Sequence, residues 1–447
     1  MRPFKNRPFA HIVVLCLAWG CWSGASRGED WVQWMGNQRD NVLRDVAQLE
    51  DLPSQPEVAW RSELDGGYAG PAVGGGRVFV TDYVTSNDVS VANFERNEFS
   101  GIERVLCFDQ ASGKLQWKHE YPVKYTVSYP AGPRCTPTID DDRVYTLGTE
   151  GDLFCFRVTD GSVVWSRNLR EDFNTKAALW GYASHPLIDG DRLICVVGGE
   201  GSHMVAFDKK TGDEIWRQGT APEQGYVPPT IIEAGGVRQL ISGRPDAIAS
   251  LDPETGKTYW SVPYEATNGS IIMSPVTVDV DGTKYLYIGG YDKKNLLLKL
   301  DPDKPAATWV WQDEVKQGIS PVNVQPLVVD GIIYGLDQKG TLMAVEIPSG
   351  DRLWETSQPL AERPLGTGTA FIVRIDSTDR FLMFTEMGDL VLGQMDRSGF
   401  KELDRANVIQ PTGTAFGRKV VWSAPAYADG KMFVRNDKEI VCVRLTP

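Results

Sequence analysis

The sequence has 447 residues, of which 42% are hydrophobic and 10% aromatic, and it carries a formal net charge of −13. This hydrophobic fraction fits a folded globular protein, and the 45 glycines and 27 prolines indicate many turns, as in all-β folds. Because a negatively charged protein is repelled by nucleic acid and by anionic membrane surfaces, both are excluded as general partners.

The N-terminus is typical of a secretory signal peptide. Basic residues in the first seven positions precede an apolar stretch from His11 to Trp22, and Ser23 and Ala25 are small residues that suit cleavage. We therefore expect residues 1–28 to be removed and the mature protein to be periplasmic or secreted; an alternative is a lipoprotein attached through Cys21. No later stretch has the ~18 apolar residues of a membrane helix, so no integral membrane segment is expected after cleavage.

The next segment, residues 29–54, is expected to form an N-terminal arm. The remaining residues, 55–447, are expected to form one domain, because a single repeat runs through them. Its fullest copy, "AFDKKTGDEIW", ends at Trp216, and related segments end at five other tryptophans at spacings of 44 to 51 residues. Each unit contains four short apolar runs separated by turn signals, which predicts the four-stranded blade of a β-propeller. The five other tryptophans that end a repeat are Trp117, Trp165, Trp260, Trp309 and Trp354.

The spacing within the repeat predicts a structural role for each position. The acid and the glycine favour a tight turn, and the tryptophan four residues later is expected to cover the seam to the neighbouring blade, with its indole N–H bonded across. The first position, on the third strand, is expected to need a small residue, so three cysteines found there are interpreted as core residues. These positions are Cys107, Cys155, Ala206, Ser250, Lys299, Ala344, Gly393 and Cys442.

Counting these units predicts an eight-bladed, all-β propeller. Six blades end at the tryptophans above, and the seventh has Leu403 in their place. The eighth is split: the C-terminus supplies three strands, and an N-terminal strand with Trp60 in the docking position completes it. Such a closure removes exposed strand edges and joins the two ends of the chain.

Two segments depart from the repeat, and they are expected to lie on one face around the central channel. The first, residues 84–102, lengthens the connection between the second and third strands of the first blade; the second, residues 170–185, lengthens the approach to the third blade. Loops held by a rigid scaffold are where binding residues usually lie.

The repeat resembles the tryptophan-docking motif of PQQ-like (quinoprotein-type) β-propellers. Ala206, Asp208, Gly212 and Trp216 match that motif in full, and the resemblance covers nearly all of the mature chain. Segments such as "DWVQWMGNQRDNV" and "LWGYASHPLIDGDRLI" look like those of secreted PQQ-like repeat proteins of Planctomycetes. More distantly, the chain resembles the exported BamB scaffold, which binds partners through its loops.

The resemblance leaves the function open, because one fold hosts several activities. The family's alcohol and sugar dehydrogenases hold pyrroloquinoline quinone (PQQ) in the channel against a disulfide of adjacent cysteines, with Ca²⁺ as a Lewis acid. PQQ and Ca²⁺ are therefore cofactors that the resemblance allows. The five cysteines of the mature chain include no adjacent pair, and the three remaining histidines show no ligand spacing, so neither a disulfide framework nor a histidine metal site is predicted.

Two sets of candidate site residues follow from the predicted channel. Aromatic, amide and arginine side chains where the chain approaches the first strands would suit a flat anionic ligand such as a quinone, or a sugar. Packing at the channel mouth is the alternative explanation. This set, with Ser274 in addition, is Arg134, Trp180, Tyr182, Tyr226, Asn323, Gln325 and Trp422.

The second set lies at the turns between second and third strands and is rich in acids. It could ring the channel and hold Ca²⁺ or a cationic ligand, or it could simply decorate turns. The residues are Asp82, Glu150, Glu200, Arg244, Asp292, Asp337, Glu386 and Asn436.

The sequence thus favours an exported scaffold, without catalysis of its own, that binds a protein or glycan partner through its loop-rich face. The alternatives are a PQQ-dependent dehydrogenase of alcohols or sugars, with Arg134 and Trp180 near the cofactor, and another channel enzyme acting on carbohydrate. No nucleophile–base pair is visible in the sequence, so no catalytic residue is predicted.

Overall fold

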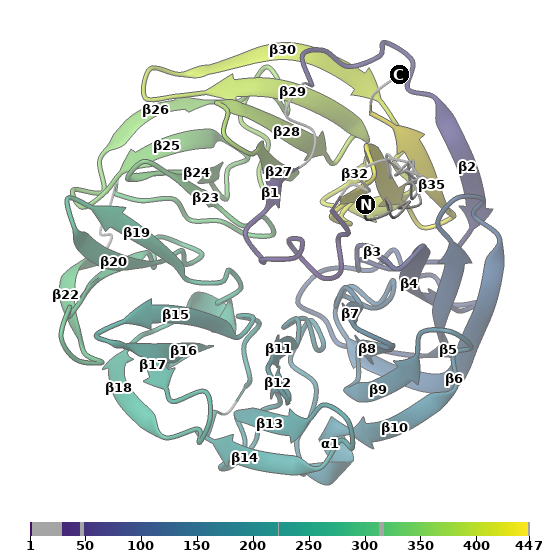
Figure 1. Ribbon diagram of the computed structural model, residues 1–447, viewed down its shortest axis with the longest axis horizontal. Helices are drawn as coiled ribbons and strands as arrows, with labels where there is room; N and C mark the ends of the chain where they lie inside the picture. The colour runs from purple at the N-terminus through teal and green to yellow at the C-terminus, as the bar shows by residue number, and fades with distance from the viewer. Residues whose placement is uncertain (2–28, 45–48, 222, 313–316, 446–447) are drawn as a thin grey trace.

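Eight sheets of four antiparallel strands stand in a ring around a central channel (Figure 1). The computed structural model describes residues 1, 29–44, 49–221, 223–312 and 317–445. The expected signal peptide and Cys21 therefore lie outside the described residues, apart from Met1. The predicted all-β, eight-bladed propeller is confirmed; the described residues contain two short helices, α1 (Leu169–Asp172) and η1 (Thr267–Gly269).

The first four blades follow one another in chain order, each from an inner to an outer strand. Their strands are β3 (Ala72–Gly74), β4 (Arg77–Val84), β5 (Asn97–Asp109) and β6 (Leu115–Val127); β7 (Thr138–Asp140), β8 (Arg143–Leu147), β9 (Asp152–Arg157) and β10 (Val163–Asn168); β11 (Leu187–Asp189), β12 (Arg192–Val196), β13 (Met204–Asp208) and β14 (Glu214–Gln218); and β15 (Thr230–Ala234), β16 (Val237–Arg244), β17 (Ala247–Leu251) and β18 (Thr258–Pro263).

The next three blades have the same order, and a small hairpin, β31 (Gly413–Ala415) and β32 (Arg418–Val420), follows them. Their strands are β19 (Val276–Val280), β20 (Thr283–Ile288), β21 (Leu296–Leu300) and β22 (Ala307–Gln312); β23 (Leu327–Val329), β24 (Ile332–Leu336), β25 (Leu342–Glu346) and β26 (Arg352–Thr356); and β27 (Ala370–Ile375), β28 (Arg380–Thr385), β29 (Asp389–Met395) and β30 (Phe400–Asn407).

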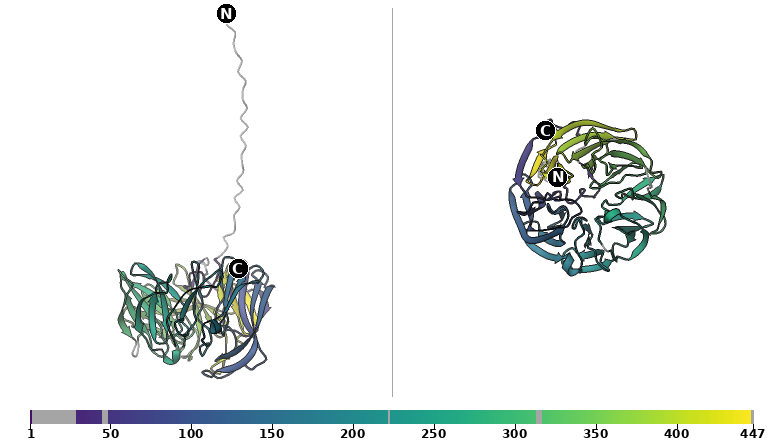
Figure 2. Two further views of the ribbon diagram at one scale, coloured as in Figure 1. Left: turned by 90° about the horizontal axis from the view of Figure 1, so that it is seen from below. Right: turned by 180° about the vertical axis from the view of Figure 1, so that it is seen from behind.

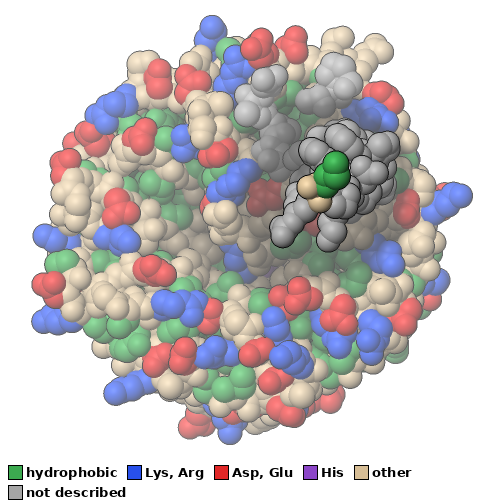
Figure 3. Space-filling view, viewed as in Figure 1, with side chains coloured by type: hydrophobic (Ala, Val, Ile, Leu, Met, Phe, Trp, Pro, Cys, Tyr) green, Lys and Arg blue, Asp and Glu red, His purple; other side chains and the backbone are tan. Residues whose placement is uncertain are grey.

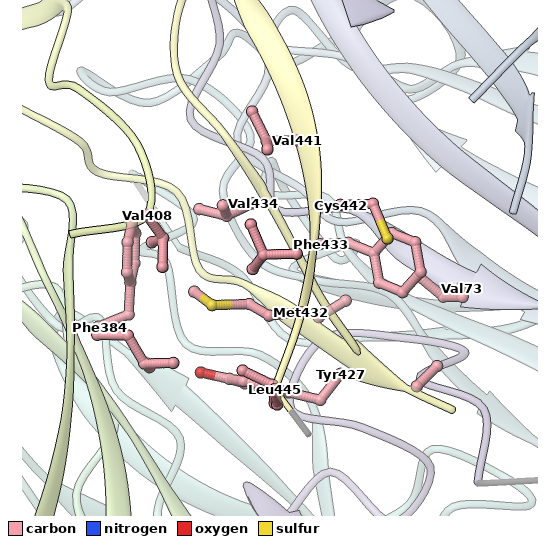
Figure 4. Packing of buried hydrophobic residues seen from close by; sticks show 14 of the residues in the cluster. Val73, Phe384, Val408, Tyr427, Met432, Phe433, Val434, Val441, Cys442 and Leu445 are labelled. Carbon is pink, nitrogen blue, oxygen red and sulfur yellow. The ribbon is translucent and has the colours of Figure 1, made fainter. Parts of the chain in front are cut away.

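The eighth blade closes the ring with strands from both ends of the chain, as predicted. Strands β33 (Ala426–Ala428), β34 (Lys431–Arg435) and β35 (Glu439–Arg444) are completed on the outside by β2 (Val58–Glu63), with Trp60 opposite Cys442. Figure 4 shows Phe433 and Cys442 of this blade packed between Val73 of the first blade and Phe384 of the seventh. The N-terminal strand is therefore held by its sheet and by the packing between blades.

In four blades the predicted docking tryptophan joins its blade to the next as expected. Trp165 donates its indole N–H to the carbonyl of Lys209 at 3.0 Å, and its ring lies against Gly212 in the next blade. A Cβ on Gly212 would stand 2.7 Å from that ring, and its φ of +76° is one that glycine alone adopts at no steric cost, so the position requires glycine. The same contacts join Trp60 to Gly113, Trp117 to Gly161 and Trp216 to Gly256.

The fifth blade corrects one prediction, because its docking residue is Trp311 and not Trp309. Trp311 donates to the carbonyl of Pro348 at 2.7 Å and packs on Gly350, whereas Trp309 is 44% exposed. The small third-strand position was misassigned too, because Leu297 pairs with Trp311 while Lys299 pairs with Thr308. The reason is that three residue pairs separate the bulge of this hairpin from its turn, as in the seventh blade, whereas one pair separates them in the third blade, so the sequence spacing is longer.

The fourth blade has no glycine turn to dock onto, because the facing turn of the fifth blade carries Lys304 and Pro305 instead. The indole N–H of Trp260 donates within its own blade, to Gln239 Oε1 at 2.8 Å. A groove of about 680 Å³ lies at this seam, between the hairpins that contain Gly235 and Gly282. The degenerate repeat in the sequence therefore marks a less regular seam between two blades.

All five cysteines of the described residues are buried and free. Cys107, Cys155 and Cys442 stand opposite docking tryptophans on third strands, so their interpretation as small core residues is confirmed. Burial raises the pKa of the Cys107 thiol to about 12 and of the Cys155 thiol to about 11, which disfavours the reactive thiolate.

The N-terminal arm crosses the channel beside the C-terminal ends of the inner strands (Figure 1). Its strand β1 (Val42–Leu43) adds in parallel to β27, and Trp31 pairs with Val73 of β3. Arg39 donates to the carbonyl of Pro186 at 2.8 Å, where the third blade begins. The arm therefore connects the inner strands of blades that lie on different sides of the ring.

Candidate functional site

The connections between blades and the turns between second and third strands emerge at the same end of the ring, because the strands of each blade alternate in direction. At this end the long β5–β6 hairpin projects beyond the ring (Figure 2, left). Figure 3 shows the opposite face of the ring, where basic and acidic side chains are intermingled around the rim. The end with the β5–β6 hairpin also carries the residues that break the repeat.

A cavity of about 240 Å³ lies in the channel among the connections between blades. Five of the seven residues predicted for a ligand line it together, although they lie up to 288 positions apart in the sequence (134 to 422). They are Arg134, Trp180, Tyr226, Asn323 and Trp422. The repeat geometry explains this convergence, because each blade brings the same connection to the channel.

The other two predicted residues are placed elsewhere, which corrects their grouping with the rest. Tyr182 is buried between blades, where it donates its hydroxyl to the carbonyl of Val197 at 3.1 Å. Gln325 is buried too. Its side-chain amide accepts from the backbone N–H of Ser274 and donates to the Ser274 carbonyl. Both side chains therefore tie neighbouring connections together, as capping residues do.

Two groups of three aromatic rings stand at the cavity. In the first, Trp180 lies 5.7 Å from Phe94 and 5.2 Å from Tyr226 between ring centroids. The indole N–H of Trp180 donates to Asn93 Oδ1 at 2.9 Å, which fixes the ring against the long connection of the first blade. The second group is Tyr129, Phe416 and Trp422, with centroids 5.8 to 6.4 Å apart.

Arg134 lines the cavity, but its guanidinium holds its own loop. Its terminal nitrogens donate to the carbonyls of Gly132, Ser128 and Tyr129, and one also reaches Thr149 Oγ1 at 3.3 Å. The guanidinium thus donates hydrogen bonds to the loop that precedes Arg134 and stabilises the connection that leads into the second blade. An anion in the cavity would have to compete with these carbonyls.

The floor of the cavity comes from the arm. Trp34 stacks on His185, with ring centroids 4.5 Å apart and planes 4° apart. Thr136 donates its backbone N–H to His185 Nδ1 at 3.1 Å, which makes Nδ1 the acceptor. Burial, followed by the charge of Arg39, lowers the pKa of His185 well below its ordinary value, so the ring is neutral at physiological pH.

The acidic turn residues are occupied by partners of their own. Asp82 accepts from Arg104 at 2.7 Å, and Glu386 accepts from Arg418 at 2.6 Å and from Trp422 at 3.2 Å. Among the described residues, no group of three or more His, Cys, Asp or Glu could hold a metal ion. Asp82 and Glu386 therefore fix turns and neighbouring loops.

Sequence reasoning missed Trp34, Asn93, His185 and Phe416 as lining residues. The arm and the hairpin of β31 and β32 lie outside the repeat. The repeat spacing therefore could not predict which of their side chains point into the channel. The one available signal for Asn93 was the length of its segment, which the repeat does not require.

The lining does not fit PQQ with Ca²⁺. PQQ is a tricarboxylate, and the one guanidinium that lines the cavity, that of Arg134, is bonded to main-chain carbonyls. No Asp or Glu is among the twenty described lining residues, whereas Ca²⁺ prefers carboxylate oxygens. The cavity of about 240 Å³ is also smaller than typical cofactor sites.

Comparison with known proteins finds a family model described as outer membrane protein assembly factor BamB, which matches residues 101–236 and 244–446. The relatives include the outer membrane protein assembly factor BamB of Salmonella typhimurium, 24% identical over 275 residues, and that of Escherichia coli, 23% identical over 273 residues. Each match covers 57% of this chain and 64% of the relative, so the matched part is less than two thirds of the relatives' length.

The similar solved structures have the same fold. BamB from Moraxella catarrhalis has a TM-score of 0.56 at 16% identity, covering 87% of this chain and 99% of that one. Quinohemoprotein alcohol dehydrogenase from Comamonas testosteroni has a TM-score of 0.60 at 14% identity, covering 94% and 81%. Among the described residues, no helix has the length and apolar character that crossing a membrane requires.

Proposed function

The chain belongs to the family described as outer membrane protein assembly factor BamB, a PQQ-like β-propeller family, and we propose that it is an exported, non-catalytic scaffold. In this proposal a protein partner docks on the end of the ring that carries the connections between blades. The observation that supports it most is a pair of exposed phenylalanines, Phe94 and Phe416, beside the cavity.

Both side chains are unusual for a protein surface. Phe94 is 55% exposed and Phe416 is 51% exposed, and both have a positive φ, at +67° and +49°. A bulky residue in this backbone region is strained, and such strain is found preferentially at functional sites. Large exposed aromatic side chains are also the residues that carry binding energy at protein interfaces.

Further contacts support a preformed docking surface. Arg96 donates to the carbonyls of Thr126 and Ala177, which anchors the connection that carries Phe94. Arg418 lies over the ring of Phe416, 5.7 Å from its centroid. Exposed Met387, in a turn at the same end, adds apolar surface. Anchored aromatic groups lose little conformational freedom on binding, which favours affinity.

The partner we propose is a protein of outer-membrane protein assembly, and the location is the periplasm or the outside of the cell. The similarity to outer membrane protein assembly factors supports the proposed partner, and the sequence of residues 1–28 supports the proposed location. The runner-up, a PQQ-dependent alcohol or sugar dehydrogenase, draws on fold similarity alone, and one fold hosts unrelated functions.

Site-specific photo-crosslinking in the native cells tests the docking face. A crosslinking amino acid replaces Phe94 or Phe416 in one pair of variants. In the control pair it replaces Val163 or Ile215, which are 43% and 46% exposed on the outer strands β10 and β14. We expect a discrete adduct with an outer-membrane assembly protein from the first pair alone. Equal adducts from all four positions, or none, would refute the proposal.

A further inference from the structure

Three polar groups at the channel cavity have no hydrogen-bond partner among the described residues. The Asn323 side chain lines the cavity and makes no hydrogen bond with any described residue. The same holds for the amide nitrogen of Asn93, whose oxygen accepts from Trp180. Since Thr136 donates to Nδ1 of neutral His185, the ring proton is on Nε2, and this N–H has no acceptor among the described residues.

The remaining lining is mostly aromatic and aliphatic and carries no free charge. Trp34, Trp180 and Trp422 come from the arm and from two different blades, so a ligand in the cavity meets aromatic rings from several directions. The lining contains no carboxylate, and the Arg134 guanidinium is bonded to its own loop. These features disfavour both cationic and anionic ligands, because a buried charge needs a partner.

These two observations select one ligand chemistry. A purely apolar ligand would leave the amides of Asn323 and Asn93 and the N–H of His185 without hydrogen bonds. A ligand with hydroxyl groups around a ring supplies acceptors and donors at its edge and C–H groups on its faces, which pack on aromatic rings. We propose that the channel cavity is a binding site for a neutral pyranose sugar.

In this site the indole of Trp180 lies against a face of the sugar ring, and Asn93, Asn323 and His185 bond its hydroxyl groups. No bond forms or breaks, since the lining offers no carboxylate to act as an acid or base. The inference goes beyond the docking role: Phe416 belongs to both surfaces, but Phe94 and Met387 lie outside the lining, and the groups that bond the sugar are not part of the docking surface.

Calorimetric titration of the purified protein tests the site. The probes are glucose, cellobiose and maltose at concentrations up to about 50 mM, with glucuronate, glucosamine and indole for comparison. We expect saturable binding of at least one neutral sugar, with weaker binding of its charged analogue. No heat from any neutral sugar, or tighter binding of indole or glucuronate, would overturn the inference.

Variants connect the binding to the cavity. We expect Asn323→Ala to weaken sugar binding at least tenfold and Trp180→Ala to abolish it, whereas Trp309→Ala, which removes an exposed ring on β22, leaves it unchanged. Near-ultraviolet circular dichroism confirms that each variant is folded. Unchanged affinity in folded Asn323→Ala and Trp180→Ala would also overturn the inference. Photo-crosslinking from Phe94 reports on docking separately, so the two proposals fail independently.

Discussion

Asp152 shows how burial changes the behaviour of one carboxyl group. It stands on β9, where Asn168 donates to it at 3.1 Å. Burial, followed by the charge of Glu103, raises the pKa of Asp152 from 3.8 to about 6. The folded state therefore holds this proton more tightly than the unfolded chain, so the stability it contributes is present below pH 4 and is lost as the pH rises through about 6.

We predict that Asp152→Asn increases the free energy of unfolding by roughly 1–2 kcal/mol at pH 7.5 and by nothing near pH 3.5, because the amide is never charged. Urea unfolding across this pH range measures the effect. The control Asp303→Asn, in an exposed turn, should leave the pH slope unchanged. A gain of the same size at both pH values would contradict the assignment.

At the residue scale, the sequence predicted the small cysteines correctly and misjudged Arg134. A residue on a repeat takes its environment from its register, which is why Cys107 and Cys442 could be placed in the core. Arg134 lies outside the repeat, and its partners are backbone carbonyls that are not visible as residue types. Sequence reasoning could therefore place it at the cavity but not predict what its guanidinium bonds.

At the scale of strands, stability depends on how the outer strand of one blade packs on the next blade. Trp311 packs on Gly350 of the next blade, whereas Trp309, two residues away on β22, is 44% exposed. The motif spacing identified the wrong tryptophan, because it assumes a bulge next to the turn, and the β21–β22 hairpin has its bulge further along. Bulge position depends on pairing with a neighbouring strand, which a spacing rule does not include.

We predict that Trp311→Ala lowers the free energy of unfolding by about 2–4 kcal/mol, because it removes the ring from the seam and leaves the Pro348 carbonyl without its donor. Trp309→Ala should change it by less than about 0.5 kcal/mol. Chemical denaturation of the two variants in parallel gives the comparison. Equal losses would show that the docking position had been misassigned again.

At the scale of the whole molecule, the arm and the split eighth blade connect blades that are far apart in the sequence. The eight-bladed closure could be predicted by counting repeats, but the course of the arm through the channel could not, since residues 29–54 share no pattern with the blades. In the structure, the backbone N–H groups of Val73, Ile139 and Arg374 donate hydrogen bonds of 2.8 Å to carbonyls of the arm. These amides belong to three different blades.

Deleting residues 29–44 should leave a folded ring with an open channel. We predict faster hydrogen exchange at the amides of Val73, Ile139 and Arg374, which lose their acceptors, and unchanged exchange at Ile194 and Leu286 in β12 and β20. Exchange followed by mass spectrometry or NMR gives the answer. Faster exchange throughout the chain would mean that the arm is needed for folding itself.

The central claim is that this propeller binds partners and does not use a quinone in its channel. Calorimetric titration of the purified protein with PQQ and Ca²⁺, together with absorbance spectra, tests it most directly. We predict no saturable binding at ligand concentrations near 100 μM, about −5.5 kcal/mol of affinity, since the lining offers neither a free cation nor a carboxylate. Saturable one-to-one binding that Arg134→Ala abolishes would contradict this prediction and favour a dehydrogenase.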